Sequence, residues 1–209
     1  MADAGSETDP RLHPLRPREW PESMRAALAV LRPEGARHSR PRQDADRPKG
    51  LNALGTLALH PDLTYAYHCF VGHILFNTTL SIRQRELLIL RVAAIRGSDY
   101  EWAQHIVLAI DNGISREEIA AVADRTVPLA WSPLEGALLD AADELVAEAA
   151  ISDPTWQTLA AELDQQQLMD LIFTVGAYDA LAMLFRSGRV QIDDDLLAWL
   201  AANDAEIGL

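Results

Sequence analysis

Signals that begin and end helices recur along the whole chain, and they restrict its fold more than any other feature. In three segments a serine is followed three residues later by glutamine or glutamate, and each side chain of such a pair can bind the other residue's backbone N–H at a helix start. These pairs are Ser81 with Gln84, Ser115 with Glu118, and Ser132 with Glu135. Gly97 and Gly113 each follow an apolar segment, as glycines at helix ends do. No segment alternates convincingly with the period of a strand, so the sequence predicts an all-α fold.

The predicted helices, by residue range, are 21–32, 51–59, 62–80, 82–96, 99–112, 115–124, 133–150, one that starts at 153, 165–186 and 196–202. Between the first two lies segment 33–50, which is rich in charge, proline and glycine and holds almost nothing apolar. This composition predicts a mobile linker or an ordered arm over a partner subunit. We therefore divide the chain into an N-terminal region, 1–50, and a helical domain, 51–209. A chain of 209 residues can bury one sizeable core or form two small helical lobes.

Charge is unevenly distributed, and it limits the partners of the helical domain. The formal net charge is -13. Residues 51–209 hold 8 of the 18 basic and 23 of the 31 acidic residues. An acidic surface repels phosphate backbones, so we expect no nucleic-acid partner. The N-terminus has no apolar signal region, and no uninterrupted apolar run approaches the roughly 20 residues that cross a bilayer. We expect a cytoplasmic protein without a membrane partner.

The single cysteine, Cys69, lies in the apolar segment YAYHCFVGHILF. One cysteine cannot form a disulfide within the chain, and free cysteines are among the most buried residue types. The sequence therefore predicts a buried, inert thiol.

Metal binding has little support in the sequence. His68 and His73 are five residues apart, which places them about 140° apart around a helix. His60 lies outside the helix that is predicted to carry them, and the chain has no H-E-x-x-H or C-x-x-C motif. We predict no metal and no cofactor, although imidazoles from separate helices can converge.

Residues 98–105, SDYEWAQH, contain the strongest candidate for chemistry. Glu101 and His105 are four residues apart, so on a helix they share one face and reach the same small volume. Histidine is the usual side chain for proton transfer near neutral pH, and a neighbouring carboxylate favours its charged form. The spacing therefore predicts a general acid–base pair.

The same region resembles the carboxymuconolactone decarboxylase and AhpD-like (alkylhydroperoxidase D) superfamily. The peroxidase branch of that superfamily carries Glu, eleven residues, and then Cys-x-Tyr-Cys-x-x-x-His. In this chain the matching Glu, Tyr and His are Glu86, Tyr100 and His105, whereas Ser98 and Glu101 stand at the two cysteine positions. The resemblance is closest over about residues 55–125. It implies an AhpD-like helical bundle that assembles into a homo-oligomer, a trimer or hexamer in the first place and a dimer in the second.

The resemblance implies a cofactor-independent enzyme that decarboxylates or isomerises a small oxygenated carboxylate or lactone by proton transfer. His105 would move the proton, while Glu101 would set the protonation state of His105 or act as the base itself. Glu86 would belong to a proton relay with His105, unless it forms an ion pair on the helix surface. Two alternatives stay open: a non-catalytic ligand-binding or interaction protein with the same fold, and an alkylhydroperoxidase-type antioxidant protein, which lacks its thiol pair here.

Three further residues are candidates for contact with the small-molecule substrate. Tyr100 occupies a motif position and could donate a hydrogen bond to a substrate oxygen, or serve only in packing. Trp102 is a packing residue in the first place and a substrate contact in the second. Ser98, in place of a thiol, is better suited to cap the helix than to act as a nucleophile.

Overall fold

The computed structural model describes residues 9–32, 34–38 and 47–203, and over these ranges it is built of helices without a strand. This confirms the predicted all-α class. The helices are η1 (Pro17–Glu19), α1 (Ser23–Val30), α2 (Leu51–Leu57), α3 (Pro61–Phe76), α4 (Ile82–Arg96), α5 (Asp99–Asp111), α6 (Arg116–Ala123), α7 (Pro133–Glu148), α8 (Asp153–Ala160), α9 (Gln165–Gly188) and α10 (Asp194–Ala202).

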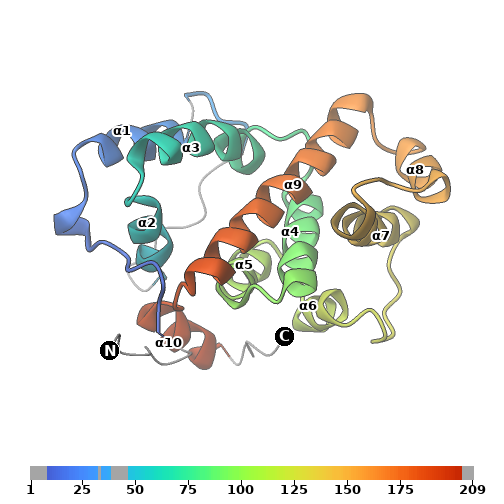
Figure 1. The fold of residues 1–209 in the computed structure, drawn as a ribbon. Coiled ribbons are helices and arrows are strands. Elements are labelled where there is room, and N and C mark those ends of the chain that lie inside the picture. Colours follow the sequence, from blue (N-terminus) through green and yellow to red (C-terminus); the bar gives the residue numbers. More distant parts are fainter. Residues whose placement is uncertain (1–8, 33, 39–46, 204–209) are drawn as a thin grey trace.

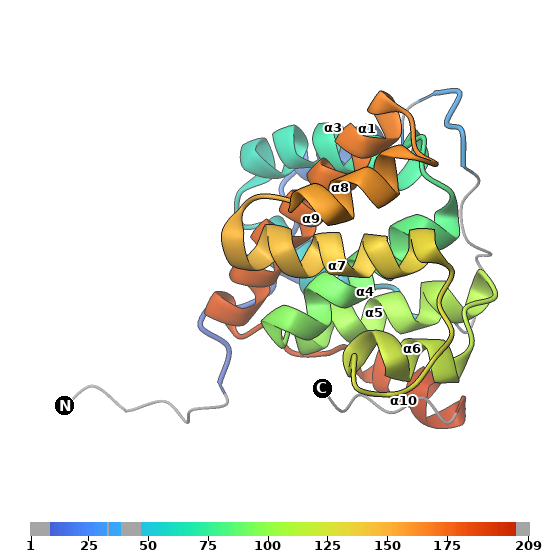
Figure 2. The ribbon, with the colours of Figure 1, turned by 90° about the vertical axis from the view of Figure 1, so that its right-hand side faces the viewer.

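Helix α4 is the centre of the bundle. It packs against α5, α6, α7 and α9, and Figures 1 and 2 show it enclosed between them. Its apolar run Leu87-Leu88-Ile89-Leu90 is fully buried, because neighbours cover every side of the helix. A helix that is apolar all round is typical of such a central position.

The predicted capping signals are confirmed at all three serines. The hydroxyls of Ser81, Ser115 and Ser132 each accept a hydrogen bond from the backbone N–H three residues later, and the Gln or Glu there binds back. Gly97 ends α4 with φ of 57°, in the left-handed region that favours glycine.

Helix α3 ends at Phe76, four residues before the predicted end at Leu80. The cause is Asp170 on α9, whose carboxylate accepts hydrogen bonds from the backbone N–H and the hydroxyl of Thr79 at 2.5 and 2.7 Å. The N–H of Thr79 is thereby removed from the helical pattern, so the chain turns before α4.

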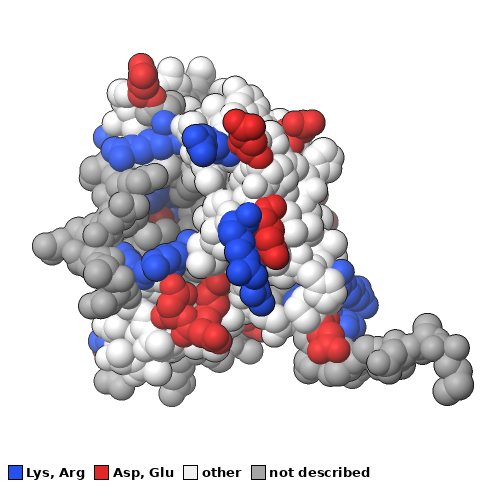
Figure 3. Space-filling model, turned by 90° about the vertical axis from the view of Figure 1, so that its left-hand side faces the viewer, with Lys and Arg blue, Asp and Glu red and all other residues white. Residues whose placement is uncertain are grey.

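The N-terminal helix packs along α3 and buries Met24 and Ala27 with Ala58 in a small core of its own. Of the predicted linker 33–50, residue 33 and residues 39–46 lie outside the described residues. Its last part is held to the start of α10, since the backbone N–H of Lys49 donates to Asp195 at 3.1 Å. On the face that carries α1 and α2, basic side chains lie beside acidic ones (Figure 3).

Helix α9 is long and apolar enough for a membrane span once polar interruptions are allowed, so the expected lack of a membrane partner stays a prediction. By length and composition α9 meets that criterion, and half of its apolar window is buried inside the protein. Core helices of soluble proteins meet the same criterion, and α9 packs against α4 and α7.

The solvent side of α9 and α3 nevertheless carries large apolar side chains. Phe70 of α3 and Phe173 of α9 are 39% and 51% exposed, and their rings meet edge to face at 5.9 Å. We call Leu63, Phe70, Met169, Phe173 and Met183 the apolar stripe; all five are exposed.

Cys69 is also exposed on α3, so the prediction of a buried thiol is wrong. One side of α3 is buried, and the side that carries Cys69 is exposed to solvent. The apolar composition of the segment does not show which side is which.

Candidate active site

Helices α4 and α5 bring Glu86 and His105 together in the interior. The Nδ1 atom of His105 lies 2.7 Å from Oε2 of Glu86, and the Glu86 side chain is completely buried. Its other oxygen, Oε1, accepts two hydrogen bonds from the guanidinium of Arg85, at 2.7 and 3.1 Å. Glu86 is therefore no surface ion pair, and its predicted proximity to His105 is observed.

Glu86 is held in its ionised form. Burial by itself would raise its pKa, but His105 and Arg85 outweigh burial through charge and hydrogen bonds, and the pKa is lowered. An ionised carboxylate only accepts hydrogen bonds, so the proton between the two groups is on Nδ1 of His105. The other ring nitrogen, Nε2, is then left for a ligand.

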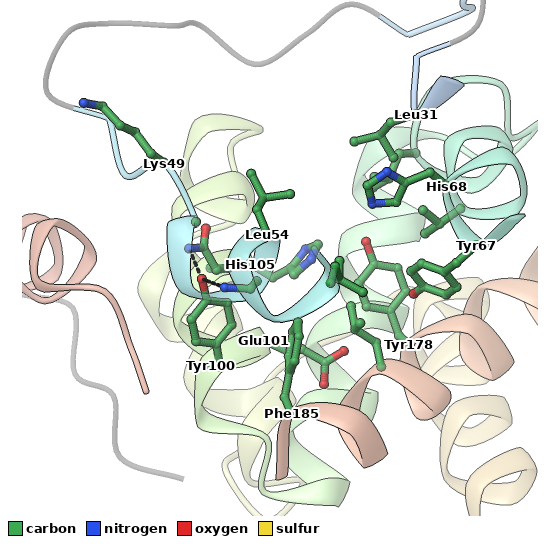
Figure 4. A pocket seen from close by; sticks show the side chains of 17 residues that line it. Leu31, Lys49, Leu54, Tyr67, His68, Tyr100, Glu101, His105, Tyr178 and Phe185 are labelled. Atoms are coloured by element: carbon green, nitrogen blue, oxygen red, sulfur yellow. Dashed lines mark hydrogen bonds between the residues drawn. The ribbon is translucent and has the colours of Figure 1, made fainter. Parts of the chain in front are cut away.

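A cavity of about 230 Å³ lies beside His105 (Figure 4). Four helices supply most of its wall. Its lining includes Ala53, Leu54 and Leu57 of α2; Tyr67, His68 and Val71 of α3; Tyr100, Glu101, Gln104 and His105 of α5; and Tyr178, Leu181 and Phe185 of α9. The predicted residues Glu101, His105 and Tyr100 thus meet at one cavity.

Glu101 of α5 is one of the residues that line this cavity. Its side chain is 2% exposed, and neither carboxyl oxygen has a hydrogen-bond partner in the described part of the chain. Burial raises its pKa to about 8; the nearby Ser98 hydroxyl opposes this rise, and the negative charge of Asp179 adds to it. The predicted pairing of Glu101 with His105 is wrong, because His105 instead turns its Nδ1 to Glu86.

Tyr100 lines the cavity and also joins three helices through its hydroxyl. Its hydroxyl donates to Oδ2 of Asp193 at 2.5 Å and accepts from the backbone N–H of Ala53 at 3.2 Å. Burial and this carboxylate raise the pKa of Tyr100. The hydroxyl thus ties α5 to α2 and to the start of α10, which leaves the aromatic ring to line the cavity.

Trp102 and Ser98 are not among the residues that line this cavity. Trp102 packs in the core with Leu196 and Leu200 of α10. Ser98 stands at the N-cap of α5 but makes no capping hydrogen bond with its side chain. Trp102 directly follows Glu101, which turns it roughly 100° away from the 101–105 face of the helix. Ser98 precedes the first residue of α5.

Four wall residues with aromatic rings, none of them predicted as a substrate contact, lie on α3 and α9, far from the motif in sequence. The Tyr178 ring meets the His105 ring edge to face at 4.9 Å, and the Tyr67 hydroxyl donates to the carbonyl of Ala177 at 3.2 Å. His68 and Phe185 complete the set. Their apolar surroundings in sequence indicate burial, but nothing in the pattern separates a cavity wall from a packed core.

The three histidines considered as metal ligands have other partners. His60 caps α3, His68 binds the carbonyl of Ala27 at 2.8 Å, and His73 binds Asp170 at 2.8 Å. Burial lowers the pKa of His68. Among the described residues no group of three or more potential ligands converges on one point.

Part of the chain matches the model of a known protein family. Residues 61–144 match the family model described as the carboxymuconolactone decarboxylase family, and this segment contains Glu86, Glu101 and His105. No curated protein matches the sequence of the chain.

Several solved structures share the fold. A variant of the debrominase Bmp8 in complex with 2,3,4-tribromopyrrole has a TM-score of 0.68 at 15% identity, over 93% of this chain and 97% of that one. The AhpD core of an uncharacterized peroxidase-related protein from Ralstonia eutropha JMP134 has a TM-score of 0.62 at 17% identity, over 77% and 94%. A similar protein from Silicibacter sp. TM1040 has a TM-score of 0.58 at 13% identity, over 79% and 95%.

Proposed function

We propose that this chain, which matches the carboxymuconolactone decarboxylase family model over residues 61–144 and shares the AhpD-like fold, is a cofactor-independent enzyme that decarboxylates or isomerises a small oxygenated carboxylate or lactone. The observation that carries the proposal is the hydrogen-bonded series Arg85–Glu86–His105, which ends at the wall of a cavity. A buried carboxylate behind an imidazole fixes its tautomer and orientation, as proton-transfer enzymes require.

In the proposed reaction each group has a part in proton transfer. In an isomerisation, Nε2 of His105 takes the proton from a carbon beside the substrate carbonyl and returns it to another carbon. In a decarboxylation, the carbon–carboxylate bond breaks, its electron pair passes into the adjacent carbonyl, and the protonated His105 then delivers a proton to carbon. Glu86 stabilises the imidazolium form in both cases.

The site also favours this proposal over a non-catalytic binding protein. A binding protein has no need for an imidazole oriented by a buried carboxylate, whereas His105 at this cavity is held by Glu86. Two observations argue against an alkylhydroperoxidase. The motif cysteines are replaced by Ser98 and Glu101. Cys69 is exposed on α3 and is not one of the residues that line the cavity. Without a thiol pair a hydroperoxide has no route to an intramolecular disulfide.

The test is proton exchange and carbon dioxide release with defined probes. The protein is incubated in D₂O with 4-carboxymuconolactone and with simpler lactones, and NMR follows deuterium incorporation and decarboxylation. We expect His105→Gln to lower the rate by about 10²–10⁴-fold, the usual contribution of a positioned acid or base. Hydroperoxide reduction with a dithiol should be negligible in both proteins. If neither deuterium nor carbon dioxide appears with any probe, the binding-protein alternative is favoured.

A further inference from the structure

His68 on α3 presents an unused hydrogen-bond acceptor to the cavity. Its Nδ1 atom lies 2.8 Å from the backbone carbonyl oxygen of Ala27. A carbonyl only accepts hydrogen bonds, so Nδ1 carries the proton, and Nε2 of the neutral ring is then an acceptor. Burial lowers the pKa of His68, which favours this neutral form. Within the described part of the chain Nε2 has no hydrogen-bond partner, although His68 lines the cavity.

The hydroxyl of Tyr178 on α9 is a second polar group that the protein leaves free. Tyr178 is 3% exposed, and its hydroxyl makes no hydrogen bond with the described residues. Over the same residues, the polar side-chain atoms that are both fully enclosed and without a partner belong to Ser98, Glu101 and Trp102. The Tyr178 hydroxyl and Nε2 of His68 therefore border open space, and both residues line the cavity. In Figure 4 this hydroxyl points into the space between the rings of His68 and His105.

The rest of the cavity suits the ring of a small molecule. Leu54, Leu57, Val71 and Leu181 supply aliphatic wall, and Phe185 adds an aromatic face. An apolar cavity of about 150 Å³ can bind benzene. The space of about 230 Å³ here is larger, so it admits a ring with one or two substituents.

We propose that His68 and Tyr178 form a hydroxyl subsite, which binds a ring that carries a phenolic or enolic hydroxyl group. The ligand O–H donates to Nε2 of His68, and the ligand oxygen accepts from the Tyr178 hydroxyl. A hydroxyl group both donates and accepts, whereas an ether or carbonyl oxygen only accepts and leaves Nε2 of His68 without a partner. Leaving a buried acceptor unpaired is costly, so His68 is a specificity-determining residue.

The hydroxyl subsite deepens the proposed function, because an enol is the tautomer of a carbonyl substrate. It rests on that function only in taking the cavity as the reaction site. Binding is measured without turnover, so the two can fail separately. Loss of proton exchange with intact selectivity for a hydroxyl would concern the reaction alone, and the reverse would concern the hydroxyl subsite alone.

The test compares phenol with anisole, the methyl ether in which the donor proton is absent. Ligand-observed NMR gives both Kd values for the wild type and for His68→Phe, which keeps a ring but has no acceptor. We expect the ratio of the anisole Kd to the phenol Kd to fall by about three- to tenfold in the variant, as the loss of one hydrogen bond implies. Comparing ratios removes the difference in hydration between the two probes.

Two tyrosines of the cavity wall give a matched pair of variants. Tyr178→Phe removes the free hydroxyl and should weaken phenol binding by about three- to tenfold. Tyr67→Phe removes a hydroxyl that already donates to the carbonyl of Ala177, and phenol binding should stay nearly unchanged. Circular dichroism checks folding, and this pair decides the outcome even where His68→Phe does not fold.

NMR of the imidazole nitrogens adds a readout that a purely structural role of His68 would not move. Its Nε2 resonance should have the chemical shift of an unprotonated nitrogen, and it should move upfield when phenol, but not anisole, is added. The hydroxyl subsite is ruled out if phenol does not bind or if Nε2 carries the proton in the free protein. It is equally ruled out if the Kd ratio is unchanged in His68→Phe, or if the two tyrosine variants weaken phenol binding alike.

Discussion

Glu86 is buried completely, and its charge is balanced from two sides. Arg85 contacts one oxygen and His105 the other, and the Arg85 side chain is itself only 7% exposed. Removing one member of a buried ion pair leaves the other charge without compensation, which typically costs about 3–5 kcal/mol. We expect Glu86→Gln to lower the free energy of unfolding by about that amount, measured by urea denaturation. Glu118→Gln, which breaks the more exposed pair with Arg83, is the control and should cost about 1 kcal/mol or less.

The raised pKa of Glu101 has a consequence for stability. Its folded pKa of about 8 exceeds the ordinary value of 4.5, so between these pH values the folded protein keeps a proton that the unfolded chain has released. The contribution of Glu101 to the free energy of unfolding is therefore full below about pH 4.5, falls by about 1.4 kcal/mol per pH unit up to about pH 8, and is constant above.

Glu101→Gln cannot titrate, so it should lose this pH dependence. Relative to the wild type, the variant should gain stability steadily from pH 5 to pH 8, as denaturant titrations at several pH values can show. A difference between the two proteins that stays constant with pH would mean that Glu101 titrates normally.

The motif spacing predicted which residues meet at the site but not how they pair. Helical periodicity places Glu101 and His105 on one face, and that face does line the cavity. A histidine side chain on this face can turn towards either acid, and the presence of Arg85 beside Glu86 fixes the choice. That choice depends on contacts between α4 and α5, which local sequence does not encode.

At the scale of elements, the contact between α1 and α3 depends on a glycine. A Cβ atom on Gly72 would lie well inside the contact distance of the carbonyl oxygen of Leu31, at the end of α1. We expect Gly72→Ala to destabilise the protein by about 1–3 kcal/mol, since the backbone of α1 must move. Because Leu31 also lines the cavity, the shape of the cavity should change with it.

Gly176 provides the matched control on α9. A Cβ atom there would meet nothing within 4 Å, and the residue is exposed. Gly176→Ala should therefore stabilise the helix by about 0.5–1 kcal/mol. Thermal unfolding of both variants checks the pair, and equal effects in the two would contradict the close α1–α3 contact.

The sequence predicted where helices start more accurately than where they end. A capping box is complete within four residues, and each of the three predicted ones forms. The end of α3 instead depends on Asp170, which is 91 residues from Thr79 in sequence and reaches it only after α9 has packed. The surface or interior position of Cys69 is likewise decided by which side of α3 the neighbours cover.

At the scale of the whole molecule, the main feature is the apolar stripe, which is exposed to solvent in the single chain. Exposed apolar side chains that lie together on α3 and α9 are typical of interaction surfaces. We predict that the chain is a homo-oligomer in which the stripe is buried against another copy, with a trimer or hexamer expected before a dimer. Light scattering at micromolar concentration should give a mass several times 23.0 kDa.

A charge within the stripe should disrupt that assembly. Phe173→Asp places a carboxylate at the centre of the stripe and should shift the mass towards that of the single chain. Trp156→Asp on α8 is the control, since Trp156 is similarly exposed, at 41%, but is not part of the stripe. A wild-type mass of one chain, or equal effects of the two substitutions, would contradict the prediction.

The predicted cytoplasmic location, and the expected lack of nucleic-acid and membrane partners, stay predictions.

Cys69 gives this surface a built-in reporter. It is the single cysteine of the sequence, it is exposed, and it adjoins Phe70 of the stripe in the chain. A thiol-reactive fluorophore would therefore label each chain once, at one known place, without any engineering. Its emission could record the meeting of two chains in real time, and the rate of labelling would show how often the surface is open.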